Sequence, residues 1–204
     1  MKALIFDFGN VVAFFDHRKA CRQLASLAKN LVAEDAVYQA VFGTSLELNF
    51  DCGKIPAHEF IERLRMTLDL TASDETIVKA WCDIFWPNDE VVSLLPRLKK
   101  SSARLVLASN TNELHFQWAL NQFAEPLACF EDFVLSYRIG SRKPALAFFR
   151  RCVEAARAAP DDCIYVDDRP DFVDVARSMG MTGFVYGAGV SLLQALSAAG
   201  VEVI

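Results

Sequence analysis

The 204-residue sequence lacks any hydrophobic run long enough to cross a membrane. Its longest uncharged apolar runs, such as residues 8–15, are much shorter than the ~20 residues that a spanning helix needs. The apolar run at residues 3–6 meets Asp7 at once and is too short for the hydrophobic region of a secretory signal peptide. We therefore expect a cytoplasmic protein with no membrane partner.

An excess of basic residues is also missing, because 21 Lys and Arg face 26 Asp and Glu, for a formal net charge of −5. A net acidic chain lacks the overall signature of a nucleic-acid-binding protein, so we expect no nucleic-acid partner. A local basic site for an anionic metabolite is not excluded. The six cysteines form no CxxC pair and are widely spread, which is typical of buried thiols in a reduced compartment.

What the sequence does have is a high hydrophobic content, 53%, and a regular alternation of short apolar runs with helical periodicity. Short apolar strands alternating with helices indicate an α/β fold, with a Rossmann-like, doubly wound parallel sheet covered on both faces. The expected strands cover residues 2–6, 104–108, 133–135, 163–166 and 183–186. The expected helices cover residues 91–98, 112–122, 144–158, 172–178 and 192–199.

Residues 17–85 have helical spacing throughout and contain no convincing strand. This block separates the first strand from the others. The sequence therefore predicts a discontinuous sheet domain, residues 1–14 and 88–204, with a helical cap domain inserted at residues 15–87. Pro87 and Asn88 are candidates for a hinge between the two.

Polar residues collect where the expected strands end. Asp7 and Gly9 follow the first strand, Ser109 and Asn110 follow the second, and Asp167 with Asp168 ends a later one, while Lys143 precedes a helix that we expect to begin at Pro144. Ligands bind at the carboxyl ends of strands in a parallel sheet. Three carboxylates cannot crowd together in ionised form without a cation, and one lysine is insufficient, so this set predicts Mg²⁺ and a bound phosphate group.

These motifs, in this order, resemble the haloacid dehalogenase (HAD) superfamily: Asp-x-Gly-Asn-Val from Asp7, Ser-Asn-Thr-Asn from Ser109, Arg-Lys-Pro at 142–144, and Val-Asp-Asp at 166–168. The resemblance covers essentially the whole chain. Ser109 to His115 and the string Asp-Cys-Gly-Lys-Ile at 51–55 look like the alpha-D-glucose-1-phosphate phosphatase branch.

The resemblance implies a role for each residue. Asp7 matches the catalytic nucleophile that forms an aspartyl-phosphate and also binds Mg²⁺, and Lys143 matches the lysine that balances the charge of nucleophile and phosphoryl group. Ser109 and Asn110 match the phosphate-binding motif. The backbone carbonyl of Gly9 and the carboxylate of Asp168 match metal ligands, with Asp167 in support.

Two positions depart from the family pattern. Gly9 stands where most family phosphatases carry a second Asp that protonates the leaving oxygen and then activates water. Such acid–base help is worth about 10²–10⁴-fold, so its absence favours a substrate with an acidic leaving group, such as a sugar 1-phosphate. Phe172 stands where relatives often have Asn or Asp, which puts one outer contact of the metal site in question.

Simpler interpretations and other functions stay open at this point. Arg142 is an alternative working cation, His115 fits ordinary helix packing, and Asp16 or His17 are weaker candidates for the missing acid. The main hypothesis is a phosphatase for a small phosphorylated metabolite, acting as a monomer or homodimer. The alternatives are a metal-independent 2-haloacid dehalogenase, although its Asp-x-Tyr-Gly-Thr string is absent, and a phosphate-binding protein without turnover.

Overall fold

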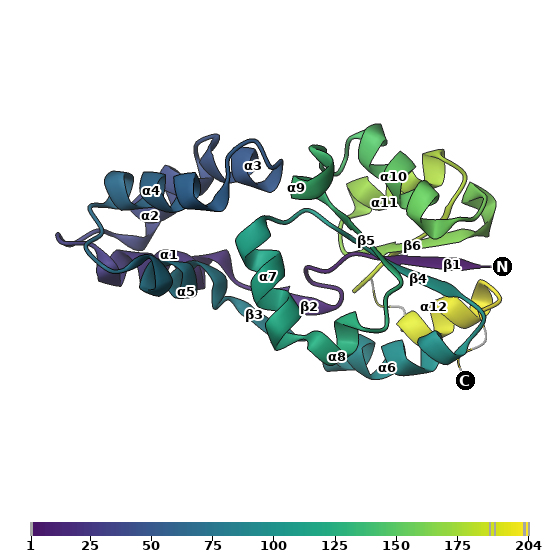
Figure 1. Cartoon of the computed structure of the whole chain (residues 1–204). Helices are drawn as coiled ribbons and strands as arrows, with labels where there is room; N and C mark the ends of the chain where they lie inside the picture. The colour runs from purple at the N-terminus through teal and green to yellow at the C-terminus, as the bar shows by residue number, and fades with distance from the viewer. Residues whose placement is uncertain (1, 188, 190, 202, 204) are drawn as a thin grey trace.

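The computed structural model describes residues 2–187, 189, 191–201 and 203, and its centre is a five-stranded parallel sheet in the order β5-β4-β1-β6-β7 (Figure 1). The strands are β1 (Ala3–Phe6), β4 (Arg104–Ser109), β5 (Asp132–Leu135), β6 (Cys163–Asp167) and β7 (Thr182–Val185). The central strand β1 pairs with β4 on one side and β6 on the other. This sheet confirms the predicted α/β class.

Alternate residues of the central strand enter two different cores, as the period of two along a strand requires. Leu4 and Phe6 belong to the larger core, and Ala3 and Ile5 to a smaller one on the opposite face. All of β1 is fully buried. Its nearly continuous apolar sequence therefore reflects a strand covered on both faces.

Helices cover both faces of the sheet (Figure 1). Leu95 of α6 (Asp89–Lys100) and Leu196 of α12 (Leu192–Ala198) pack into the larger core. Phe149 of α10 (Leu146–Ala156) and Val173 of α11 (Pro170–Ser178) pack into the smaller core. The shorter connecting elements are α7 (Glu113–Gln122), α8 (Ala124–Leu127), α9 (Ser136–Ile139) and a 3₁₀ turn (Pro160–Asp162).

The segment after β1 forms a helical lobe beside the sheet (Figure 1). Its helices are α1 (His17–Leu27), α2 (Glu34–Phe42), α3 (Leu46–Asp51), α4 (Ala57–Leu68) and α5 (Asp74–Cys82). Phe50, Phe60 and Trp81 are almost completely buried between them, with ring centroids of Phe50 and Phe60 4.3 Å apart. The amphipathic spacing of the sequence thus fills a core inside the lobe.

A two-stranded antiparallel ribbon connects the helical lobe to the sheet. It consists of β2 (Ala13–Phe15) on the way out and β3 (Phe85–Pro87) on the way back. The prediction that residues 17–85 contain no strand is therefore wrong at the end of that segment, where β3 begins at Phe85. A three-residue strand is too short to show a periodic pattern, so the pairing of the two connections was invisible in the sequence.

The helix expected to begin at Pro144 begins instead at Leu146. Ala145, the residue before the helix, has extended dihedral angles, φ −62° and ψ 131°, so Pro144 lies outside the helix. Proline does occupy the first turn of a helix in α11, at Pro170. Lys143 therefore lies in a loop and not at a helix start.

Five of the six cysteines are buried, and Cys52 is half-buried. None of the helices within the described residues has both the length and the hydropathy that a membrane span requires.

Candidate active site

The polar strand ends converge on one cavity of about 230 Å³ at the carboxyl edge of the sheet. Asp7 enters it from β1, Ser109 from β4, and Asp168 from the residue after β6. Glu47 and Asp51 of α3 line the same cavity from the helical lobe. Residues from distant parts of the chain thus meet where ligands bind in parallel sheets.

Asp7 continues β1, with its backbone N–H donating to the carbonyl of Val166 at 2.8 Å. Its carboxylate oxygen Oδ1 lies 2.8 Å from the Nζ of Lys143 and accepts from the N–H of Phe8 at 2.7 Å. Burial raises the pKa of Asp7 to about 7, and the charge of Asp167 adds to the rise while Lys143 opposes it. The Asp7 carboxylate therefore has one cationic partner, Lys143, in surroundings where burial disfavours its ionised form.

Lys143 is a buried ammonium group held between two carboxylates. Its Nζ lies 2.7 Å from Oδ2 of Asp167 as well as 2.8 Å from Asp7. The hydroxyl of Tyr165 donates to the same Asp167 oxygen at 2.8 Å. Burial works to lower the pKa of Lys143, but Asp7 and Asp167 outweigh it, so the pKa rises and the ammonium stays charged.

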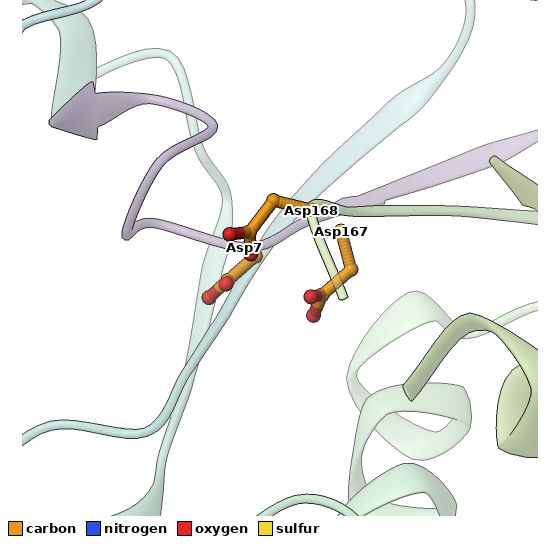
Figure 2. A group of neighbouring side chains, drawn as sticks. All are labelled: Asp7, Asp167 and Asp168. Atoms are coloured by element: carbon orange, nitrogen blue, oxygen red, sulfur yellow. The ribbon is translucent and has the colours of Figure 1, made fainter. Parts of the chain in front are cut away.

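Three carboxylates gather at the ends of β1 and β6 (Figure 2). Ligand oxygens of Asp7, Asp167 and Asp168 all lie within 4.8 Å of one another. Burial also raises the pKa of Asp168, although the Asn10 amide donates to its Oδ2 at 3.0 Å. A cluster of oxygen donors with one lysine to balance three acids fits a hard divalent cation such as Mg²⁺.

The loop after β4 is locked against the Lys143 loop by Asn110. The Asn110 amide accepts from the backbone N–H of Lys143 at 2.8 Å and donates to its carbonyl at 3.1 Å. Ser109 is buried at the cavity wall, and the Ser136 hydroxyl accepts from the N–H of Thr111, two residues later, at 2.9 Å. The Asn110 side chain thus positions Lys143. Of the two residues expected to bind phosphate, Ser109 is therefore the one whose side chain we expect to do so.

The ring of Phe15 occupies the space that a side chain at position 9 would need. An ideal Cβ at position 9 would lie only 2.7 Å from Cε1 of Phe15, which reaches the site from β2. An aspartate at position 9 therefore could not fit without moving that ring. Phe172, the second departure, packs its ring 5.4 Å from the Nζ of Lys143 and 4.1 Å from the Arg169 guanidinium.

Arg142 lies next to Lys143 in sequence but faces the helical lobe. Its Nη1 is 3.7 Å from Oε2 of Glu47 and 3.9 Å from Oδ2 of Asp51. Asp51 also accepts from the Asn112 amide at 3.0 Å. Burial and the neighbouring Glu47 charge raise the pKa of Asp51 well above its usual range. Lys143, and not Arg142, is therefore the cation beside Asp7.

The two histidines at the cavity differ in their surroundings. His115 is buried, with its Nδ1 3.2 Å from the Asn112 amide and its Nε2 3.2 Å from the carbonyl of Trp81, and burial lowers its pKa to about 3. These contacts fit the packing interpretation. His17 lines the cavity with its ring 4.7 Å from that of Phe15 and 4.6 Å from that of Phe42. Asp16 caps α1 by accepting from the N–H of Arg18 at 2.8 Å.

Several contributors were not recognised in the sequence. Asn10, at φ 57°, turns the chain so that its amide reaches Asp168, and asparagine tolerates this left-handed conformation better than most residues. Tyr165 has the sequence pattern of an ordinary strand residue, although its position two residues before Asp167 places both side chains on one face of β6.

Asn88, the hinge candidate, is anchored by donating to the carbonyl of Val11 at 2.7 Å and to the Tyr186 hydroxyl at 2.8 Å.

Comparison with curated proteins gives a relative of nearly equal length. The chain is 27% identical to D-ribitol-5-phosphate phosphatase from Bacteroides thetaiotaomicron over 97% of both proteins. It is 23% identical to a sesquiterpene phosphatase from Aspergillus oryzae, over 89% of this chain and 88% of that protein.

Solved structures share the fold over nearly the whole chain. A haloacid dehalogenase family enzyme from Bacteroides thetaiotaomicron, in complex with magnesium and inorganic phosphate, aligns with a TM-score of 0.81 and 23% identity over 96% of this chain and 98% of that one. An L-2-haloacid dehalogenase from Xanthobacter autotrophicus aligns with a TM-score of 0.62 and 15% identity over 99% and 84% of the two chains.

The haloacid dehalogenase-like hydrolase family matches residues 1–180. That span contains β1, the helical lobe, and all of the acidic and basic residues at the cavity described above. The chain therefore belongs to the haloacid dehalogenase-like hydrolases.

Proposed function

We propose that this hydrolase is a Mg²⁺-dependent phosphatase that acts on a small phosphorylated metabolite through an aspartyl-phosphate at Asp7. The observation that carries the proposal is the Asp7 carboxylate, which lies 2.8 Å from Lys143 inside a cavity that also contains Ser109 and Asp168. The relative named D-ribitol-5-phosphate phosphatase and the fold neighbour with magnesium and phosphate support the same reaction class.

Magnesium would be held by the carboxylates of Asp7 and Asp168 and the backbone carbonyl of Gly9, with Asp167 in support. When bound, it would neutralise the acidic cluster and polarise the phosphate oxygens. The raised pKa values of Asp7 and Asp168 fit this assignment, because burial disfavours both carboxylates in their ionised form and the charge of Asp167 adds to the effect, so a bound cation would stabilise them.

The residues of the chain would divide the remaining work. Asp7 attacks the phosphorus atom, and the bond from phosphorus to the leaving oxygen breaks. Lys143 orients Asp7 and offsets the charge of the phosphoryl group, and the Ser109 hydroxyl with the backbone at Asn110 binds the phosphate oxygens. Water then hydrolyses the aspartyl-phosphate and regenerates Asp7.

We infer a preference for a sugar 1-phosphate, as in the alpha-D-glucose-1-phosphate phosphatase branch that the motifs resemble. The support is Gly9, which has no proton to donate, together with the Phe15 ring that occupies the adjoining space. An anomeric hydroxyl is more acidic than an ordinary sugar alcohol, so it leaves more readily without a proton donor. Hydrolysis of glucose 1-phosphate should exceed that of glucose 6-phosphate, and the opposite order would contradict this preference.

We also propose that residues 15–87 form a cap over the site and that residues 1–14 with 88–204 form the catalytic domain. Residues 1, 188, 190, 202 and 204 of that domain lie outside the described part of the chain. Glu47 and Asp51 support the division, because they reach the cavity from α3 while the nucleophile belongs to the sheet. A cap that closes excludes water from the reacting phosphate.

One assay tests the reaction class. Wild-type protein is incubated with p-nitrophenyl phosphate with Mg²⁺ and with excess chelator, beside Asp7→Asn. We expect activity that requires the metal and is absent from the variant. Metal-independent halide release from a 2-haloacid would instead indicate the dehalogenase, and inactivity toward a broad panel of phosphate esters would indicate a binding protein.

A further inference from the structure

The cavity has a second polar region, on the side of the helical lobe, that the phosphate chemistry does not use. Glu47 and Asp51 reach it from α3, and Arg142 reaches it from the loop before α10. These three side chains are 18%, 6% and 31% exposed, so they are partly shielded from bulk water. We call Glu47, Asp51 and Arg142 the distal cluster.

Arg142 is too far from the two carboxylates of the distal cluster to form direct hydrogen bonds with them. Arg142 Nη1 lies 3.7 Å from Glu47 and 3.9 Å from Asp51. Charge attraction acts over those distances, but a direct hydrogen bond requires about 2.7–3.2 Å. A polar group beside the pair, off the line that joins the guanidinium and the carboxylate, could therefore bond to both.

A hydroxyl group fits this gap better than other common substrate groups do. A hydroxyl accepts from a guanidinium N–H and donates its own proton to a carboxylate, whereas a carbonyl or a second phosphate can only accept. The Glu47 carboxylate also disfavours a second anionic group at this end of the substrate.

Aromatic side chains also line the cavity. Phe15 and Phe85 line it, with ring centroids 6.3 Å apart, and His17 lies beside Phe15. Polyols present C–H groups and hydroxyls along the same chain or ring, so a cavity lined by both aromatic rings and a charged pair suits both kinds of group. The cavity volume of about 230 Å³ is below the ~300–1,000 Å³ of drug-sized pockets, which favours a small substrate.

We propose that Glu47 and Arg142 determine substrate specificity by binding a hydroxyl of the leaving group, so that the substrates are phosphate monoesters of small neutral polyols, sugars or alditols. This proposal rests on the proposed phosphatase function and identifies the residues that bind the organic part of its substrate. Asp51 completes the distal cluster by holding the Asn112 amide of the loop after β4.

The test compares kcat/KM for glucose 1-phosphate and for D-ribitol 5-phosphate with kcat/KM for p-nitrophenyl phosphate, which has no hydroxyl on its organic part. Glu47→Gln and Arg142→Gln should each reduce the ratio for the better polyol substrate by about 10-fold or more, as expected for a lost hydrogen bond to a charged group. The double variant should lose little beyond either single variant, because both residues bind the same hydroxyl.

Glu75→Gln is the matched control, since Glu75 is an exposed acid in the first turn of α5 on the same lobe. It should keep the wild-type ratio. Thermal unfolding of every variant separates a change in specificity from misfolding.

Equal losses on all substrates, or no loss in correctly folded Glu47→Gln and Arg142→Gln, would overturn the specificity proposal. Wild-type hydrolysis of p-nitrophenyl phosphate without any preference for polyol phosphates would overturn it while leaving the phosphatase function intact. Wild-type inactivity toward every phosphate ester would overturn both.

Discussion

The two ends of the cavity are built in different ways. The phosphate end is formed by residues that directly follow buried parallel strands, such as Asp7 and Asp168, and its charges are in direct contact at 2.7–2.8 Å. The distal cluster is formed by α3 and a loop, and its charges stand 3.7–3.9 Å apart. A rigid, tightly paired end suits one group common to all substrates, while a looser end suits a group that differs between substrates.

The largest effect should follow from removing the nucleophile at the phosphate end. Asp7→Asn should reduce Mg²⁺-dependent phosphatase activity by roughly 10³-fold or more, because the amide cannot attack phosphorus. Its stability should be unchanged or higher, since a carboxylate whose ionised form is disfavoured by burial is removed while Lys143 keeps Asp167 as a partner. Steady-state kinetics and urea unfolding measure both quantities. Retained activity would place the nucleophile elsewhere.

Lys143→Ala should be the most destabilising change at the phosphate end. It leaves Asp7 and Asp167 buried without their shared cation, which costs about 3–5 kcal/mol of the free energy of unfolding. Adding Asp167→Asn should restore part of that loss, because one unpaired charge disappears. Urea unfolding of the single and double variants checks this, and simple additivity of the two changes would contradict it.

Gly9→Ala tests the contact between the sheet and the ribbon that leads to the helical lobe. The new Cβ would meet the Phe15 ring at 2.7 Å, so we expect a loss of about 1–3 kcal/mol from overpacking. Phe15→Ala should make the same change at position 9 much less costly. Chemical unfolding of the four proteins in the cycle measures the coupling, and a Gly9→Ala cost independent of residue 15 would refute this account of the site.

The smallest change in stability should come from Asp51 of the distal cluster. Burial and Glu47 raise the pKa of Asp51, so the folded state keeps a proton that the unfolded chain releases at lower pH. The free energy of unfolding is therefore not reduced by Asp51 below the unfolded pKa, near 3.9. It decreases as pH rises from there toward the raised folded pKa. Asp51→Asn removes this decline and retains an acceptor for Asn112.

Thermal unfolding at several values between about pH 5 and pH 8 measures this difference. The wild-type melting temperature should fall relative to Asp51→Asn as pH increases. Parallel curves for the two proteins would mean that Asp51 titrates normally.

The phosphate end could be predicted because its residues follow strands whose buried pattern is visible in the sequence. An apolar run such as residues 3–6 fixes where the strand ends, and a parallel sheet brings such ends together. Besides the family resemblance, a helix start at Pro144 would favour Lys143 over Arg142, yet the helix begins two residues after that proline, at Leu146. The proximity of Lys143 to Asp7 was expected for a partly wrong local reason.

The distal cluster could not be predicted, because nothing in the periodicity of α3 says how the helical lobe docks on the sheet. Glu47 and Asp51 are four residues apart on one helix, a spacing equally common on a solvated surface. The blocking role of Phe15 depends on the pairing of β2 with β3, between segments about 70 residues apart, whose strands span only three residues each. Docking and long-range pairing are decided by tertiary packing, which local patterns do not record.

Whether Asp7 forms an aspartyl-phosphate is tested most directly by acid-quenching the wild-type protein during turnover of p-nitrophenyl phosphate with Mg²⁺. Its peptides are then analysed by mass spectrometry. We expect one added phosphoryl group on the peptide that contains Asp7, and none in Asp7→Asn. Turnover with no phosphorylated peptide at any quench time, or with the phosphoryl group on a different residue, would contradict it.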